Sequence, residues 1–118
     1  MSNANVTLEL IGAPTDVGAS VRGAGMGPDA LRVAGLPEAL ARQGYAVVDR
    51  GKLAGPATPW TQPPSGLRHL DEVIAWNRSV YQAIDTALGA GHVPLMMGGD
   101  HCLAIGSISA VAWHARKR

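Results

Sequence analysis

Asp100 and His101 are the two side chains whose types and position most clearly allow chemistry. They follow an apolar run and two glycines in the stretch MMGGDHCLAIGS. Glycines carry no Cβ, so the backbone can turn sharply and place the next side chains beyond the end of a strand. An imidazole there can bind a divalent metal ion, and a nearby carboxylate can orient it. Taken alone, the pair favours a simpler interpretation, a turn or N-cap acid followed by a histidine at a helix start.

Two other arrangements offer weaker alternatives. Cys102 beside His101 suggests a cysteine nucleophile, but adjacent residues at a helix start point in different directions. A glycine-rich loop with Gly23, Gly25 and Gly27, together with Asp49 after a second strand, suggests a Rossmann-like nucleotide-binding module. That fingerprint needs its first glycine directly after the first strand, whereas about ten residues intervene here. The spacing therefore disfavours nucleotide binding.

The composition is that of an ordinary globular chain. The 118 residues are 47% hydrophobic and 16% charged with a net charge of +1, which suits one domain or a piece of one and gives no reason to expect nucleic acid. A single cysteine excludes an intrachain disulfide and agrees with a reducing compartment. No signal peptide pattern is found, and no apolar segment approaches the ~18 residues of a spanning helix. We expect a cytoplasmic protein with no nucleic-acid or membrane partner.

Strand and helix patterns alternate along the chain. Residues 6–12, 45–51 and 92–97 are short apolar runs that predict three strands. Helical patterns follow each strand: one begins at Gly27-Pro28 and is interrupted by Pro37, one spans about 70–89, and one follows Leu103. The long helix should bury one face, formed by Leu70, Val73, Ile74, Val80, Tyr81, Ile84, Ala87 and Leu88. The proline-rich residues 52–66 predict a surface loop.

This order predicts a parallel sheet with helices on its faces. Ligands of such sheets gather at the carboxyl ends of the strands. The loop after Gly12 and the turn from Gly98 to His101 both follow strands, so we expect them to meet at one edge of the sheet, with the His101 ring directed into a shared cleft. A packing role is expected for Trp60, Trp76 and Trp113, and a turn role for Asp16.

Two longer stretches resemble the arginase and agmatinase family of ureohydrolases. PLMMGGDHCLAIGSISA is similar to the segment in which Gly-Gly-Asp-His presents the first histidine ligand of a two-manganese cluster, and IGAPTDVGASVRGAGMGPDALRVAGL resembles the family's first strand, loop and helix start. Within the family, GAP, AIGSISA and RVAGL are most similar to arginases. The resemblance spans nearly all of the chain. It departs at Cys102, where serine is usual, and at Ala110, where glycine is usual.

The resemblance implies a three-layer α-β-α fold with a parallel sheet, of which residues 1–118 are an incomplete N-terminal portion of one catalytic domain. It implies Mn²⁺-dependent hydrolysis of L-arginine, or a related guanidino compound, to L-ornithine and urea by a homo-oligomer. His101 would be a metal ligand, Asp100 its neighbour outside the first ligand shell, and Arg22 a residue at the rim of the site.

The family's later Asp-x-His-x-Asp and Asp-x-Asp segments, which supply the other metal ligands, have no counterpart in the chain. We therefore assign no catalytic residue and expect the chain to be inactive alone. The alternative function is that of a non-catalytic partner subunit, a portion of a ureohydrolase that pairs with another chain.

Overall fold

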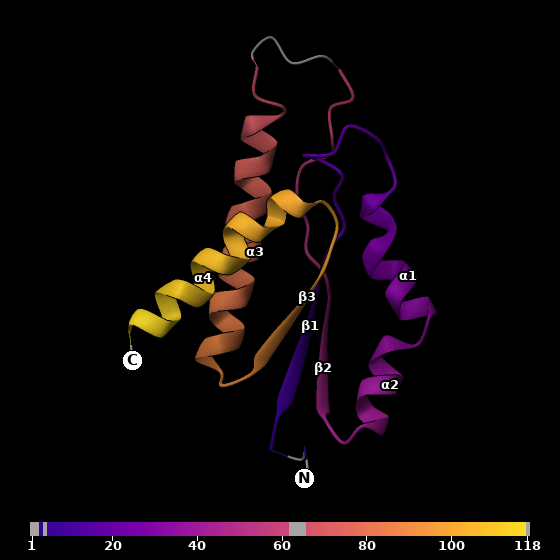
Figure 1. Ribbon diagram of the computed structural model, residues 1–118, viewed down its shortest axis with the longest axis vertical. Helices are drawn as coiled ribbons and strands as arrows, with labels where there is room; N and C mark the ends of the chain where they lie inside the picture. Colours follow the sequence, from indigo (N-terminus) through magenta and orange to yellow (C-terminus); the bar gives the residue numbers. More distant parts are fainter. Residues whose placement is uncertain (1–2, 4, 62–65, 118) are drawn as a thin grey trace.

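The computed structural model describes residues 3, 5–61 and 66–117, and its centre is a three-stranded parallel sheet (Figure 1). The strands are β1 (Thr7–Ala13), β2 (Ala46–Lys52) and β3 (Val93–Gly98), and they lie in the order β2-β1-β3. Both outer strands run parallel to β1. The predicted sheet is confirmed, and each strand begins one residue later than the sequence pattern indicates.

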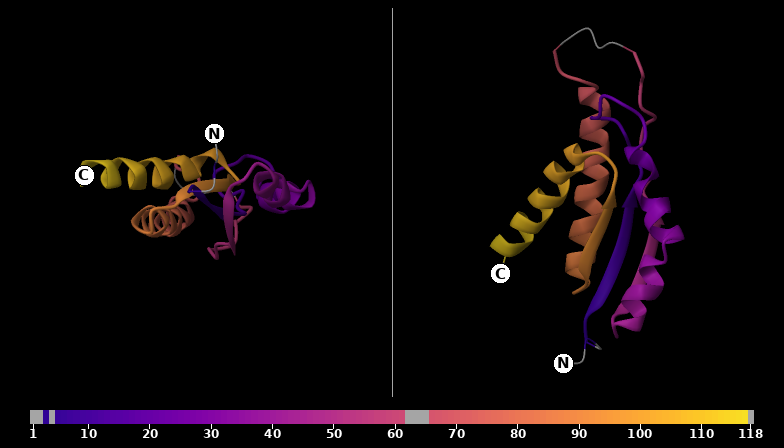
Figure 2. Two further views of the ribbon diagram at one scale, coloured as in Figure 1. Left: turned by 90° about the horizontal axis from the view of Figure 1, so that it is seen from below. Right: turned by 45° about the vertical axis from the view of Figure 1, so that its right-hand side comes forward.

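Helices connect the strands and lie on both sides of the sheet. Figure 2 shows the helices after β1 on one side and the long helix before β3 on the other, with the last helix packed beside the long one. Their bounds are η1 (Ala24–Met26), α1 (Gly27–Val33), α2 (Leu36–Arg42), α3 (Leu70–Gly89), η2 (His101–Leu103) and α4 (Ala104–Arg116). The predicted surface loop after β2 contains residues 62–65, which lie outside the described residues.

The break between α1 and α2 has a different cause from the one predicted. Gly35 has a φ of 88°, a left-handed conformation that ends α1 and redirects the chain. Pro37 lies in the first turn of α2, where a helix does not need the missing N–H. The glycine therefore interrupts the helix, and the proline helps to begin the next one.

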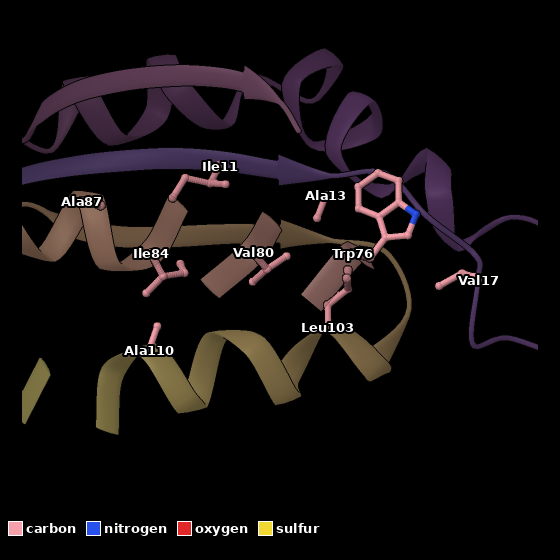
Figure 3. Packing of buried hydrophobic residues seen from close by; sticks show 9 residues of the cluster. All are labelled: Ile11, Ala13, Val17, Trp76, Val80, Ile84, Ala87, Leu103 and Ala110. Atoms are coloured by element: carbon pink, nitrogen blue, oxygen red, sulfur yellow. The ribbon is translucent and has the colours of Figure 1, made fainter. Parts of the chain in front are cut away.

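The hydrophobic core lies between the sheet and the pair α3 and α4 (Figure 3). The prediction for the buried face of α3 is partly wrong, because Leu70 and Ile74 are exposed while Trp76 and Asn77 are buried. Asn77 is buried because its Oδ1 accepts a hydrogen bond of 2.7 Å from the backbone N of Gly106, in the first turns of α4. The core residues are Ile11, Ala13, Val17, Trp76, Val80, Ile84, Ala87, Leu103 and Ala110.

One buried carboxylate links all three strands. Glu9 of β1 is only 4% exposed in its side chain, and its oxygens lie 2.7 Å from Arg50 Nε on β2 and 2.6 Å from His92 Nδ1, just before β3. Burial raises the pKa of Glu9, but the hydrogen bonds to His92 and Arg50 outweigh this effect and hold that pKa below its ordinary value. The ionised carboxylate thus helps to fix the register of the sheet.

We predict that Glu9→Gln lowers the free energy of unfolding by about 1–3 kcal/mol near neutral pH, because the Arg50 guanidinium loses its buried counter-charge and the hydrogen bonds to the carboxylate are weakened. The pKa of Glu9 is lowered on folding from an ordinary value of 4.5, so its contribution is present above that pH and is lost as the pH falls through the folded pKa. The difference between parent and variant should therefore shrink in acid. Urea unfolding over a pH series measures it.

Glu38→Gln is the matched control, because Glu38 lies exposed on α2. It should leave the free energy of unfolding within about 0.5 kcal/mol of the parent. A Glu9→Gln effect that stays constant into acid, or that equals the control, contradicts the role given to this carboxylate.

Candidate functional site

The turn after β3 meets the loop after β1 at the carboxyl edge of the sheet, as the sequence predicts. The backbone N of Gly99 donates to the carbonyl of Ala24 at 3.1 Å, and the backbone N of Asp100 donates to the carbonyl of Thr15 at 2.9 Å. Two backbone hydrogen bonds therefore hold the Gly98–His101 turn against the loop and helix start that follow β1.

Glycine is required at this junction because the backbones approach so closely. A Cβ on Gly27 would lie 2.2 Å from the carbonyl oxygen of Gly98, and one on Gly99 would lie 2.3 Å from that of Ala13. Gly99 also has a φ of 87°, which side chains other than glycine rarely adopt. The start of α1 and the turn are thus packed backbone to backbone.

Asp100 and His101 have different surroundings in this turn. Asp100 caps the short helix η2, since its Oδ2 accepts a hydrogen bond of 3.0 Å from the backbone N of Cys102. His101 is exposed, and among the described residues its imidazole has no hydrogen-bond or ion-pair partner. Asp100 therefore has the N-cap role that the simpler interpretation of the sequence predicts. The His101 ring stays available to a ligand.

Cys102 lacks the properties of a nucleophile. Burial raises the pKa of its thiol to about 12, and the adjacent Asp100 carboxylate acts in the same direction. The thiolate is the reactive form of cysteine, so a protonated thiol in this position is inert at neutral pH. The cysteine and histidine pair considered from the sequence is therefore not supported.

Asp16 organises the glycine-rich loop from within. Its Oδ1 accepts hydrogen bonds from the backbone N of Gly23 at 3.1 Å and of Gly25 at 2.6 Å. A phosphate-binding loop needs such N–H groups free for its ligand. Here a carboxylate of the same loop already uses them, which confirms the structural role expected for Asp16 and counts against a phosphate site.

Asp49 is likewise engaged within the chain. Its carboxylate accepts two hydrogen bonds from the guanidinium of Arg32, at 2.8 and 3.1 Å, and one of 2.8 Å from the backbone N of Gly51. The hydrogen bond from Arg32, followed by that from Gly51, lowers the pKa of Asp49. A ribose-binding acid must face an open site, so the Rossmann-like alternative loses its second feature as well.

Arg22 and Trp60 join two loops at this edge. The Arg22 guanidinium carbon lies 4.8 Å from the centroid of the Trp60 ring, within the range of a cation–π contact. Trp60 is 38% exposed, whereas Trp76 is buried and its indole N donates to the carbonyl of Pro56 at 2.9 Å. The loop after β2 therefore contacts α3 through the hydrogen bond from Trp76 to Pro56, and it contacts the loop after β1 through Trp60 and Arg22.

A cavity of about 310 Å³ lies between the loops that follow β1 and β2. Thr15 and Asp16 line it from one side, residues 53–58 from another, and Trp76 closes it. Neither Asp100 nor His101 is among the lining residues, so the shared cleft expected from the sequence is not the cavity found here.

The described part of the chain does not contain a complete metal site. Within residues 3, 5–61 and 66–117, no three side chains of His, Cys, Asp or Glu gather in a way that could hold a metal ion. One exposed imidazole at the carboxyl edge is what the described residues offer. Within the same residues, no helix is long and apolar enough to cross a membrane.

Comparison with known proteins identifies the class to which this arrangement belongs. The family model described as "Arginase family" matches residues 6–118. The arginase of Bacillus caldovelox is 40% identical over 109 residues, which are 91% of this chain and 36% of that protein. The arginase of Agrobacterium fabrum is 38% identical over 107 residues, or 90% and 33% of the two chains.

Solved structures agree with the sequence comparison. The B. caldovelox arginase structure superposes with a TM-score of 0.84 at 38% identity, covering 92% of this chain and 37% of that one. The 1.7 Å crystal structure of Bacillus subtilis arginase superposes with a TM-score of 0.83 at 36% identity, covering 92% and 36%. The chain belongs to the arginase family, and it spans about a third of the length of the curated relatives that it matches.

We predict that Gly27→Ala lowers the free energy of unfolding by about 1–3 kcal/mol, because the added Cβ forces the start of α1 away from Gly98. Hydrogen exchange of the Gly99 and Asp100 amides should become faster. Gly89→Ala is the control, since a Cβ there meets open space at the end of α3. Equal stability of Gly27→Ala and the parent contradicts the tight junction.

Proposed function

We propose that this chain is part of a manganese-dependent arginase, which hydrolyses L-arginine to L-ornithine and urea, and that His101 is one of its metal ligands. The observation that carries the proposal is the exposed His101 imidazole, which has no partner among the described residues. A fixed turn holds it at the carboxyl edge of the sheet in a chain of the arginase family. A neutral imidazole in this situation is a suitable Mn²⁺ ligand.

Asp100 contributes by positioning the metal-binding turn. Its carboxylate accepts a hydrogen bond from the backbone N of Cys102, and its own backbone N donates to the carbonyl of Thr15. These two hydrogen bonds fix the position of His101 at the start of η2. Arg22, which is exposed and lies over Trp60, is proposed to belong to the rim of the same edge. A related guanidino compound is the alternative substrate.

The described residues do not by themselves fit a manganese centre. A hard divalent cation of this kind takes about six donors, many of them carboxylate oxygens, and one imidazole gains little over hydration. We therefore propose that the other ligands lie in the part of an arginase domain that has no match here, and that the 118-residue chain alone is inactive. A cytoplasmic homo-oligomer is the proposed setting of the complete enzyme.

A second candidate function is that of a non-catalytic partner subunit. It is favoured by the lack of a metal cluster among the described residues. The two functions differ in whether the chain gains activity when the rest of an arginase domain is supplied.

We predict that the purified chain with added Mn²⁺ releases no urea from L-arginine above background, and that isothermal titration finds at best weak Mn²⁺ binding. The chain should then be joined covalently to the portion of B. caldovelox arginase outside the aligned region. We expect that chimera to release urea and to bind Mn²⁺.

In the chimera, His101→Ala should lower kcat/KM by about a hundredfold or more and weaken Mn²⁺ binding, because one ligand is lost. His114→Ala near the end of α4 is the matched control and should change neither property. Robust urea release by the 118-residue chain alone would refute the proposed incompleteness. Equal effects of the two substitutions in the chimera would refute the role of His101.

A further inference from the structure

A pocket of about 480 Å³ lies between β2 and α3, and we call it the β2–α3 pocket. It is separate from the turn that carries the metal-ligand candidate, because neither Asp100 nor His101 lines it. Sites for small molecules typically have volumes of about 300–1,000 Å³. β2 carries Asp49, Arg50 and Lys52, and such charges are typical of a strand edge that faces solvent. The β2–α3 pocket is therefore large enough for a small ligand and accessible to it.

Part of the lining of this pocket is aliphatic. Ile11 of β1 and Ala83 of α3 contribute to it, together with Leu53 and Ala54, which follow β2. Ile11 belongs to the buried core, and Leu53 and Ala83 are half-buried side chains that pack against that core. A short aliphatic stem that enters the pocket therefore exchanges contact with water for contact with these side chains, which is favourable.

Arg50 brings a partly unsatisfied cation to the β2 side of the pocket. Its Nε donates to Glu9 Oε1 at 2.7 Å, and among the described residues its two terminal Nη groups have no hydrogen-bond or ion-pair partner. The second oxygen of Glu9 is also occupied, because it lies 2.6 Å from His92 Nδ1. The buried carboxylate thus holds the arginine in place through one nitrogen, and the guanidinium keeps two nitrogens with N–H groups for a ligand.

The α3 side of the pocket is polar and also has free hydrogen-bonding groups. Ser79, Gln82 and Thr86 are spaced three and four residues apart, so they lie on one face of the helix, and all three line the pocket. Within the part of the chain that the structure describes, their side chains have no hydrogen-bond partner. Two hydroxyl groups and an amide are therefore available to a ligand that Arg50 binds from the β2 side.

We infer that the β2–α3 pocket binds a small aliphatic monocarboxylate, whose carboxylate accepts hydrogen bonds from the Arg50 Nη groups and whose stem packs on the aliphatic lining. Among the described residues that line the pocket, Glu9 is the one acid, and both of its oxygens already have partners. A guanidinium matches the geometry of a carboxylate, and the aliphatic lining favours an anion with a stem over an inorganic one. Neither His101 nor a metal ion takes part, so this binding goes beyond the proposed function.

The test is an NMR titration of the isotope-labelled chain with butyrate at constant ionic strength. We expect saturable shifts of the Arg50 Nε–H signal and of the backbone amides of Leu53, Gln82 and Ala83, with a Kd of about 1–10 mM, as suits a small ligand with one charged contact. Butyramide lacks the charge and acetate lacks the stem, so each should bind at least about fivefold more weakly. Inorganic phosphate over the same concentrations should give no saturable shift.

Arg50→Lys should weaken butyrate binding at least about fivefold, because lysine keeps a positive charge beside Glu9 but cannot donate two parallel hydrogen bonds to the ligand. Arg42→Lys is the matched control, since Arg42 is an exposed arginine at the end of α2 that does not line the pocket. Circular dichroism shows whether each variant folds. If Arg50→Lys does not, Gln82→Ala decides and should weaken binding about threefold. If the chain alone does not fold, the covalent chimera takes its place with the same expected results.

Each of three results overturns the monocarboxylate site. The first is a set of butyrate shifts no larger than those from sodium chloride at the same ionic strength. The second is equal affinity for butyrate and for any of butyramide, acetate and phosphate, since the charge and the stem would then not both be recognised. The third is an equal effect of Arg50→Lys and Arg42→Lys. The proposed arginase function fails separately, in the urea assay of the chimera, which does not involve the β2–α3 pocket.

Discussion

The close backbone contact between the start of α1 and the turn after β3 is the constraint on which the rest of the structure depends. Gly27 and Gly98 approach so closely that a methyl group has no room between them. Through this contact the loop after β1 and the turn after β3 become one rigid edge. Every side chain of interest for chemistry, including His101, takes its position from that edge.

The same edge explains why the two members of the acid and histidine pair have different roles. A sharp turn at the end of a strand leaves N–H groups that need acceptors, and the Asp100 carboxylate satisfies one of them while capping η2. The hydrogen bond to Cys102 holds the Asp100 side chain in place, and it thereby also holds the backbone of His101 between them. His101 can therefore be exposed, with no partner for its ring among the described residues, and still be well positioned, because its backbone rather than its ring is held.

The sequence predicted the strands and helices well, because they follow from local patterns. It predicted poorly the side-chain contacts between residues that lie far apart in the chain. Three apolar runs gave three strands, because the alternation of short strands and helices leaves few other topologies. The burial of Asn77 was missed because its side chain bonds to Gly106 of the next helix as well as to Val73, and a helical hydrophobic pattern does not indicate such a contact. The side-chain contacts of Glu9 with Arg50 and His92 join residues that are 41 and 83 positions apart in the chain. Contacts between residues so far apart in the chain leave no mark in the local pattern of an apolar strand.

The sequence could predict only the part of the candidate site whose residues are in this chain. The Gly-Gly-Asp-His turn placed one imidazole correctly at the carboxyl edge, since strand ends and glycines determine that geometry locally. A metal centre needs donor side chains from the ends of several strands. Among the described residues, the three-stranded sheet brings one exposed imidazole to its carboxyl edge and no group of three possible ligands. The described residues therefore fix the position of the His101 imidazole locally, but they do not bring a group of three possible metal-binding side chains together.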